Sequence, residues 1–248
     1  MAEPILIMGK SSTGKSTSLR NLPPAQTMIL TPNAKSLPWE GGDANYERGK
    51  NLFVTNQISN GSKDAQNPVE QAGLKQIIRQ VAEKAPHIRY LVLEDFTHFF
   101  SARIFDKSFL NRKTGSEAFQ RYTEFAADVY DAIFKDLQNL RKDLYLILIA
   151  HTDVDESGYH AFKAPGKLLT EKIDVPSYFT YIFHSMTKES EAGVEYIFQT
   201  NKNSIYHAKS PMGAFTQLYI PNDLKPILDR IDAYRGVTPA QPAAAPQQ

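Results

Sequence analysis

The chain has 248 residues, of which 42% are hydrophobic and 22% charged, and its formal net charge is +1. This length and composition fit one ordinary globular domain, and the balanced charge means that any nucleic-acid site must be a local basic patch. The absence of cysteine excludes disulfides, thiolate metal sites and a cysteine nucleophile.

The first feature along the chain is a phosphate-binding signature between a predicted strand and a predicted helix. Residues 4–8 form a short apolar run of strand type, and residues 9–16 match G-x-x-x-x-G-K-[ST] at every fixed position. Residues 16–22 can form a helix before two prolines end it. In this arrangement the loop amides and the helix N-terminus face a bound phosphate chain.

This P-loop predicts a nucleotide site with ATP or ADP and Mg²⁺ as its cofactors. Lys15 is expected to act catalytically by reaching the β- and γ-phosphates, and the Ser16 hydroxyl is expected to ligate Mg²⁺. The residues predicted to bind the nucleotide are Gly9, Lys10, Ser11, Ser12, Thr13, Gly14, Lys15, Ser16 and Thr17.

Lys10 lies five residues before Lys15, which is the spacing of the signature lysine in deviant P-loop ATPases of the ParA/MinD type. Residues 11–13 are Ser-Ser-Thr, where that family places two glycines, so the resemblance is incomplete. A solvent-exposed Lys10 is therefore the expectation.

Strands and helices alternate through the next part of the chain. Apolar runs at residues 27–31, 90–93 and 144–150 predict buried strands, and residues 33–50 and 55–67 are expected to be loops. A helix is predicted from an N-cap at Asn67 to Pro86. A second helix is predicted over residues 116–141, with a core stripe of Phe119, Tyr122, Phe125, Ala126, Val129, Ile133, Leu137 and Leu140.

The pattern changes towards the C-terminal end. Residues 181–186 and 195–200 predict an antiparallel strand pair at the sheet edge, and residues 224–234 predict a short helix. The fold class is therefore α/β, with a mainly parallel sheet flanked by helices. One domain is predicted over residues 1–236, and the Pro/Ala/Gln-rich residues 237–248 are predicted to be disordered. With no signal segment or membrane-length apolar run, a cytoplasmic protein without membrane contact is expected.

Two carboxylates, Glu94 and Asp95, end a predicted strand about 80 residues after Lys15. At the carboxyl edge of an open α/β sheet they would share a crevice with the P-loop. One is expected to hold Mg²⁺ and the other to activate water, and the favoured assignment is Asp95 for the metal and Glu94 for the base, with the reverse left open. His151 follows another strand, where it either senses the γ-phosphate or merely closes the strand; His98 and His184 are expected to be structural.

Basic and aromatic residues alternate between residues 103 and 113. Arg103, Lys107, Arg112 and Lys113 are interspersed with Phe105, Phe109 and Leu110. Such a segment suits either a single-stranded nucleic-acid site or a solvated loop over a small apolar cluster.

The order of these motifs resembles the P-loop ATPases encoded by bacteriophages and prophages, which are similar to RecA/RadA-type core domains and include the Sak-type single-strand annealing ATPases. The resemblance covers roughly residues 4–215. Its elements are the P-loop, residues 18–22 and 35–39, Leu93-Glu94-Asp95-Phe96, Ala150-His151, residues 165–169 and Ala208-Lys209-Ser210.

The resemblance implies a RecA-like fold, Mg²⁺-dependent ATP hydrolysis and single-stranded DNA binding in recombination, annealing or replication. It also implies a homo-oligomer that works beside phage replication or recombination proteins in the bacterial host cytoplasm.

Two departures from RecA/RadA-type proteins bear on catalysis. Their water-activating glutamate near the end of the second strand is replaced here by Asn33, which cannot take a proton, so that Glu94 is the base or hydrolysis is slow. Their Lys-x-Arg element reads Lys209-Ser210-Pro211, so Lys209 is the residue expected to act on a neighbouring subunit.

Two other functions stay open from the sequence. ATP can set assembly or partner binding without driving turnover, or the P-loop can serve a small-molecule kinase whose lid is the segment over residues 103–113.

Overall fold

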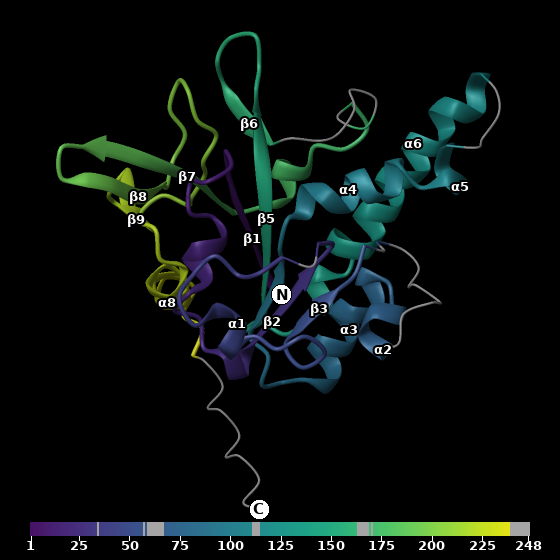
Figure 1. Cartoon of the computed structure of the whole chain (residues 1–248), viewed down its shortest axis with the longest axis horizontal. Helices are drawn as coiled ribbons and strands as arrows, with labels where there is room; N and C mark the ends of the chain where they lie inside the picture. The colour runs from purple at the N-terminus through teal and green to yellow at the C-terminus, as the bar shows by residue number, and fades with distance from the viewer. Residues whose placement is uncertain are drawn as a thin grey trace, which may run out of the picture.

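A computed structural model describes residues 1–33, 35–56, 58, 67–110, 115–162, 169 and 171–238 (Figure 1). The roles suggested for Arg112 and Lys113, the motif at residues 165–168 and the tail from residue 239 lie outside these residues. Most of the loop predicted over residues 55–67 lies outside them as well.

Within the described residues, nine strands form one sheet in the order β3-β2-β4-β5-β1-β7-β8-β9, with β6 paired to β5. The strands are β1 (Glu3–Gly9), β2 (Thr27–Thr31), β3 (Leu52–Val54), β4 (Tyr90–Leu93), β5 (Tyr145–Val154), β6 (His160–Phe162), β7 (Tyr181–Ser190), β8 (Gly193–Gln199) and β9 (Tyr219–Pro221).

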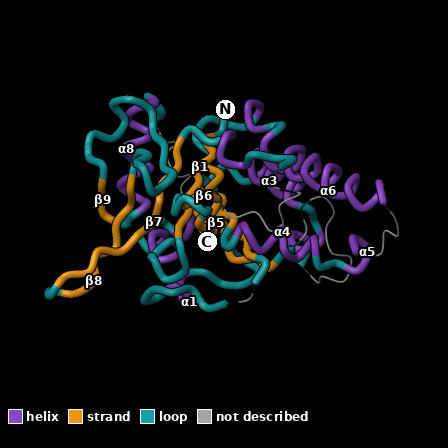
Figure 2. Tube along the Cα trace, turned by 90° about the horizontal axis from the view of Figure 1, so that it is seen from above, coloured by secondary structure: helices purple, strands orange, loops and turns teal. Residues whose placement is uncertain are grey.

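The centre of the sheet is parallel and its far edge antiparallel, which confirms the predicted fold class. β1 lies between β5 and β7 and runs parallel to both, and β4, β2 and β3 continue the parallel sheet. β7 then turns back into β8, and β8 pairs antiparallel with β9. The β7–β8 hairpin extends away from the helices (Figure 2). All seven residues of β1 are buried, as expected for a strand covered on both faces.

Helices cover both faces of the sheet. Leu6 and Met8 of β1 join the larger core cluster, which is shared with α3 (Leu74–Lys84), α4 (Phe96–Ile104) and α6 (Gly115–Val129). Ile5 and Ile7 point to the opposite face, where α8 (Leu224–Arg235) and the segment around α1 (Gly42–Asn45) cover them. None of the helices in the described residues is long and apolar enough to cross a membrane.

The helix predicted over residues 67–86 is broken in two. Asn67 caps α2 (Pro68–Gln71) as expected, because its side chain accepts a hydrogen bond from the Val69 amide. Gly73 then adopts an extended conformation, and α3 begins only at Leu74. The interruption is consistent with the low helix propensity of glycine. The Glu70 carboxylate accepts a hydrogen bond from the Val54 amide of β3.

The helix predicted over residues 116–141 is also shorter than expected. It is regular to Val129, and a π-helical turn (Tyr130–Phe134) and a short 3₁₀ helix (Leu137–Asn139) follow. Phe119 was predicted in the core, but 57% of it is exposed. The reason is that the first turns of α6, with α5 (Lys107–Leu110), project beyond the body of the domain (Figure 1).

A buried ion pair ties α8 to the amino-terminal edge of the sheet. Arg89, just before β4, lies 2.8 Å from Asp232 of α8, and each side chain is only 6% exposed. The Tyr145 hydroxyl of β5 donates to the same carboxylate at 2.6 Å. Asp232 therefore neutralises one buried cation and accepts from one buried hydroxyl.

Asp232→Ala is expected to lower the free energy of unfolding by about 3–5 kcal/mol, because the Arg89 guanidinium stays buried without its carboxylate. Chemical denaturation measures the loss. Asp229→Ala is the control on the same helix, since it removes only the exposed partner of Lys225 and should cost less than about 1 kcal/mol. Equal losses in the two variants would contradict this account.

Candidate functional site

The P-loop is shaped by two glycines that have no room for a side chain. Gly9 closes β1, and a Cβ there would lie 2.4 Å from the Ser185 carbonyl oxygen of β7. Gly14 has a φ of +87°, and a Cβ there would lie 2.8 Å from the Tyr196 ring. These are the two glycines of the motif, and both are required by close approach to the neighbouring strands. The loop is also pinned by the Ser185 hydroxyl, which donates to the Thr13 carbonyl at 2.5 Å.

The helix after the loop is shorter than predicted. Residues 16–22 were expected to be helical, but only a 3₁₀ turn (Ser16–Leu19) forms. Beyond it, the Arg20 guanidinium donates to the Asn222 carbonyl at 2.6 Å and the Asn21 amide donates to Asp223 at 2.6 Å. These contacts join the end of the turn to the start of α8.

Lys15 is buried and folded back on its own loop. Its Nζ donates to the Lys10 carbonyl at 2.5 Å. Burial lowers the pKa of Lys15 to about 8, against the opposing effect of Glu94 and Asp95. Lys10 itself is exposed, as expected.

Glu94 lies against the P-loop. Its Oε1 accepts from the Ser16 hydroxyl at 2.5 Å, and its Oε2 is buried with no hydrogen-bond partner among the described residues. Burial raises the pKa of Glu94 to about 7, although the Ser16 hydrogen bond opposes the shift. A serine hydroxyl beside a carboxylate with an unsatisfied oxygen is an all-oxygen donor set that fits Mg²⁺.

Asp95 points elsewhere because its backbone is left-handed. With φ 53° and ψ 40° it directly precedes α4, and its carboxylate meets β5 and the loop after β2. Lys35 lies 2.9 Å and the Asn33 amide 3.3 Å from its Oδ2. Hydrogen bonding from His151, helped by Lys35, holds the pKa of Asp95 below its ordinary value.

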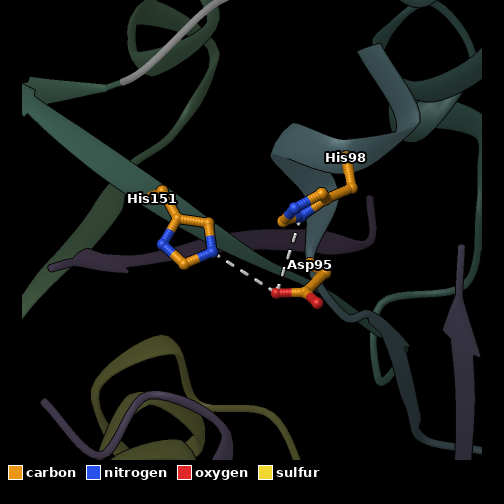
Figure 3. Close-up of side chains that lie close together, drawn as sticks. All are labelled: Asp95, His98 and His151. Carbon is orange, nitrogen blue, oxygen red and sulfur yellow. Dashed lines mark ion pairs between the residues drawn. The ribbon is translucent and has the colours of Figure 1, made fainter. Parts of the chain in front are cut away.

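Two histidines face the other oxygen of Asp95 (Figure 3). His151 Nε2 lies 3.5 Å and His98 Nδ1 3.9 Å from Asp95 Oδ1, and the imidazole rings meet edge to face. The donor atoms of the three side chains lie within 4.8 Å of one another, so the group could hold a metal ion. His151 is brought to the P-loop because it pairs with Gly9 in the β1–β5 register. His98 was expected to be structural but lies in this site, three residues after Asp95 on α4.

A cavity of about 990 Å³ lies at the P-loop. On the side of β1 where β4 and β5 lie it is lined by Asp95, His98 and His151, and on the side where β8 and β9 lie it is lined by Tyr196 and Asn222. Between them lie the P-loop and neighbouring residues Ser11, Ser12, Gly14, Lys15, Ser16, Thr17, Arg20 and Lys35.

Several of these lining residues had no predicted role. Lys35 could have been found, because it begins the element at residues 35–39 that is part of the family resemblance. Tyr196 and Asn222 carried no signal, because β8 and β9 approach the loop only through the tertiary fold.

Lys209 does not reach the P-loop of its own chain. Its backbone pairs with Ile182, which lies beside Leu6 of β1, three residues before Gly9. Its Nζ donates to the Phe179 carbonyl at 2.8 Å.

The chain was compared with known proteins. A family model described as an AAA domain matches residues 2–212. No curated protein matches the chain. Among solved structures the chain is similar to a KaiC-like protein from the hyperthermophilic archaeon Pyrococcus horikoshii OT3, with 14% identity, a TM-score of 0.38, and coverage of 81% of this chain and 79% of that one.

The two adjacent carboxylates should affect stability with opposite pH dependence. The raised pKa of Glu94 makes its ionised form unfavourable in the folded state, so that Glu94→Gln should gain stability over the wild type as the pH rises from about 4.5 to 7. The lowered pKa of Asp95 stabilises the fold above about pH 4, so that Asp95→Asn should be less stable at neutral pH and recover in acid.

Denaturation of both variants and the wild type from acid well below pH 4 up to pH 7 measures the two differences. Asparagine also tolerates the left-handed backbone at position 95, so that Asp95→Asn tests the charge and not the conformation. Stability differences that are constant with pH would contradict the assignment.

Proposed function

The chain belongs to the AAA domain family, whose model covers residues 2–212, and from this premise we propose that it is a Mg²⁺-dependent ATPase acting on single-stranded DNA. The observation that supports ATP chemistry best is the contact between the Ser16 hydroxyl and Glu94 at the P-loop, with Asp95 and His151 beside it.

In this proposal the phosphates lie on the P-loop amides and Lys15 exchanges the Lys10 carbonyl for phosphate oxygens. Ser16 and Glu94 would hold Mg²⁺, which when bound would neutralise phosphate charge and polarise the γ-phosphoryl group. This reverses the assignment favoured from the sequence, because Glu94 and not Asp95 contacts the Ser16 hydroxyl.

Asp95 then takes the water-activating role. Its carboxylate is held ionised by His151 and Lys35, so that it is a weak base and a good hydrogen-bond acceptor. We propose that Asp95 orients the attacking water. In this proposal His151 connects Asp95 to the γ-phosphate. Asn33 donates to Asp95 and supports its position. A weak base fits slow hydrolysis.

Three substitutions separate these roles. Lys15→Ala should abolish nucleotide binding. Glu94→Gln should remove the dependence of ATP affinity on Mg²⁺, whereas Asp95→Asn should bind Mg²⁺-ATP normally and hydrolyse it about 10²–10⁴ times more slowly. Calorimetry with and without Mg²⁺ and single-turnover hydrolysis are the measurements. The opposite pattern, with Mg²⁺ dependence lost in Asp95→Asn, would restore the sequence-based assignment.

The proposal for single-stranded DNA rests on the helix that starts at the site. α4 follows Asp95 and ends at Ile104. The next residue, Phe105, is 74% exposed, and Lys107 nearby is exposed as well. Phe109 is not available for stacking on a base, because it is buried under the guanidinium groups of Arg103 and Arg121. An exposed aromatic ring beside a lysine can stack on a DNA base while the lysine contacts a phosphate. α4 connects these two residues to Asp95. The phage-type resemblance supports a role in recombination, annealing or replication, beside other phage proteins.

Single-stranded DNA should therefore stimulate hydrolysis. The double variant Phe105→Ala/Lys107→Ala should bind a labelled oligonucleotide about 10-fold more weakly and with a shallower salt dependence, as measured by fluorescence anisotropy. Tyr234→Ala, at a partly exposed ring on α8 across the sheet, is the control and should bind as the wild type does. Absence of DNA binding and stimulation would leave the alternative of an ATP-dependent assembly switch.

We also propose a homo-oligomer. Lys209 is exposed, and its Nζ donates to the Phe179 carbonyl and not to its own P-loop. The nucleotide that it would contact is therefore the one bound to a neighbouring subunit.

A further inference from the structure

We propose that the base of the nucleotide stacks on Tyr196, at the end of the cavity formed by β8 and β9, and that the site prefers purines. This inference rests on the proposed ATP site and adds the part that recognises the base.

The orientation of the nucleotide follows from the two ends of the cavity. The γ-phosphate belongs at the end with Asp95 and His151, because these are the groups that can orient water. The ribose and base must then extend in the opposite direction, past Thr17. On that side of β1 the sheet continues through β7 to β8, and the cavity is lined there by Tyr196, Pro221 and Asn222.

Tyr196 is an aromatic platform at this end. Its ring rests on Gly14, where a Cβ would come within 2.8 Å of Cδ1. The residue is 48% exposed and lines the cavity, and among the described residues no other aromatic ring packs against it. An exposed ring seated on the phosphate-binding loop has its free surface where a base can lie.

The platform is fixed relative to the phosphate site. The backbone N–H of Asn222 donates to the Tyr196 carbonyl at 3.2 Å. The buried side-chain amide of Asn222 donates to the Ser185 hydroxyl at 3.1 Å. Ser185 in turn donates to Thr13 of the P-loop. One chain of hydrogen bonds therefore links the strand that carries Tyr196 to the loop that holds the phosphates.

Stacking explains the preference for purines. A π-face accepts any base, and the larger purine ring system covers more of it than a pyrimidine does. ATP and GTP should therefore bind more tightly than CTP and UTP, and tripolyphosphate should bind without any contribution from Tyr196.

The test compares ATP, CTP and tripolyphosphate as ligands of the full chain by calorimetry. Tyr196→Ala should weaken ATP about 10-fold and leave tripolyphosphate within twofold, whereas Tyr196→Phe should bind both as the wild type does. Tyr219→Ala removes a partly exposed tyrosine from the adjacent strand β9 and is the matched control, with no change expected. If Tyr196→Ala also loses affinity for tripolyphosphate, Tyr196→Leu is measured in its place. Leucine keeps an apolar side chain on Gly14 but has no π-face on which a base can stack.

The outcomes separate this inference from the function on which it rests. Wild-type protein that binds neither ATP nor tripolyphosphate would overturn the ATP site itself. Full ATP affinity in Tyr196→Ala or Tyr196→Leu, or equal affinity of the wild type for CTP and ATP, would overturn the stacking proposal and leave the ATP site standing.

Discussion

The parallel pairing of β1 with β5 on one side and β7 on the other is the constraint on which the site depends. It places Gly9 beside His151 in one direction and brings the Ser185 carbonyl against the loop in the other. Parallel strands end at the same edge of a sheet. The strand order alone therefore brings together the P-loop, the carboxylates after β4 and the histidine of β5. The helices on both faces bury the strands and so hold this edge in register.

A single left-handed residue separates two neighbouring carboxylates into different chemical states. Glu94 stays against the P-loop, buried and readily protonated, whereas Asp95 turns towards cationic and imidazole groups and stays ionised. Asp95 lines the cavity, whereas Glu94 accepts a hydrogen bond from Ser16 beside it. Strained backbone of this kind is commonly found at functional sites.

Local sequence signals predicted the P-loop, the central strands and the residues at their carboxyl ends, because buried parallel strands read as continuous apolar runs. They overestimated helix length at residues 67–86, where Gly73 interrupts the helix, and at residues 116–141, where a π-helical turn follows Val129. They favoured Asp95 for the metal and left the reverse open, since the direction in which each carboxylate points depends on the backbone angles of Asp95. They also missed the contacts of Lys35 with Asp95 and of Tyr196 with Gly14, because the partners in each contact are distant in sequence.

The hydrogen bond from Lys15 to the Lys10 carbonyl has a consequence for how the loop takes up a ligand. The ammonium group is already desolvated and satisfied, and the glycines and Ser185 already hold the loop in shape. Arrival of a phosphate chain therefore exchanges one acceptor for another around a preorganised cradle. Little conformational entropy is lost in that exchange, so the contacts made with the phosphates are retained as affinity.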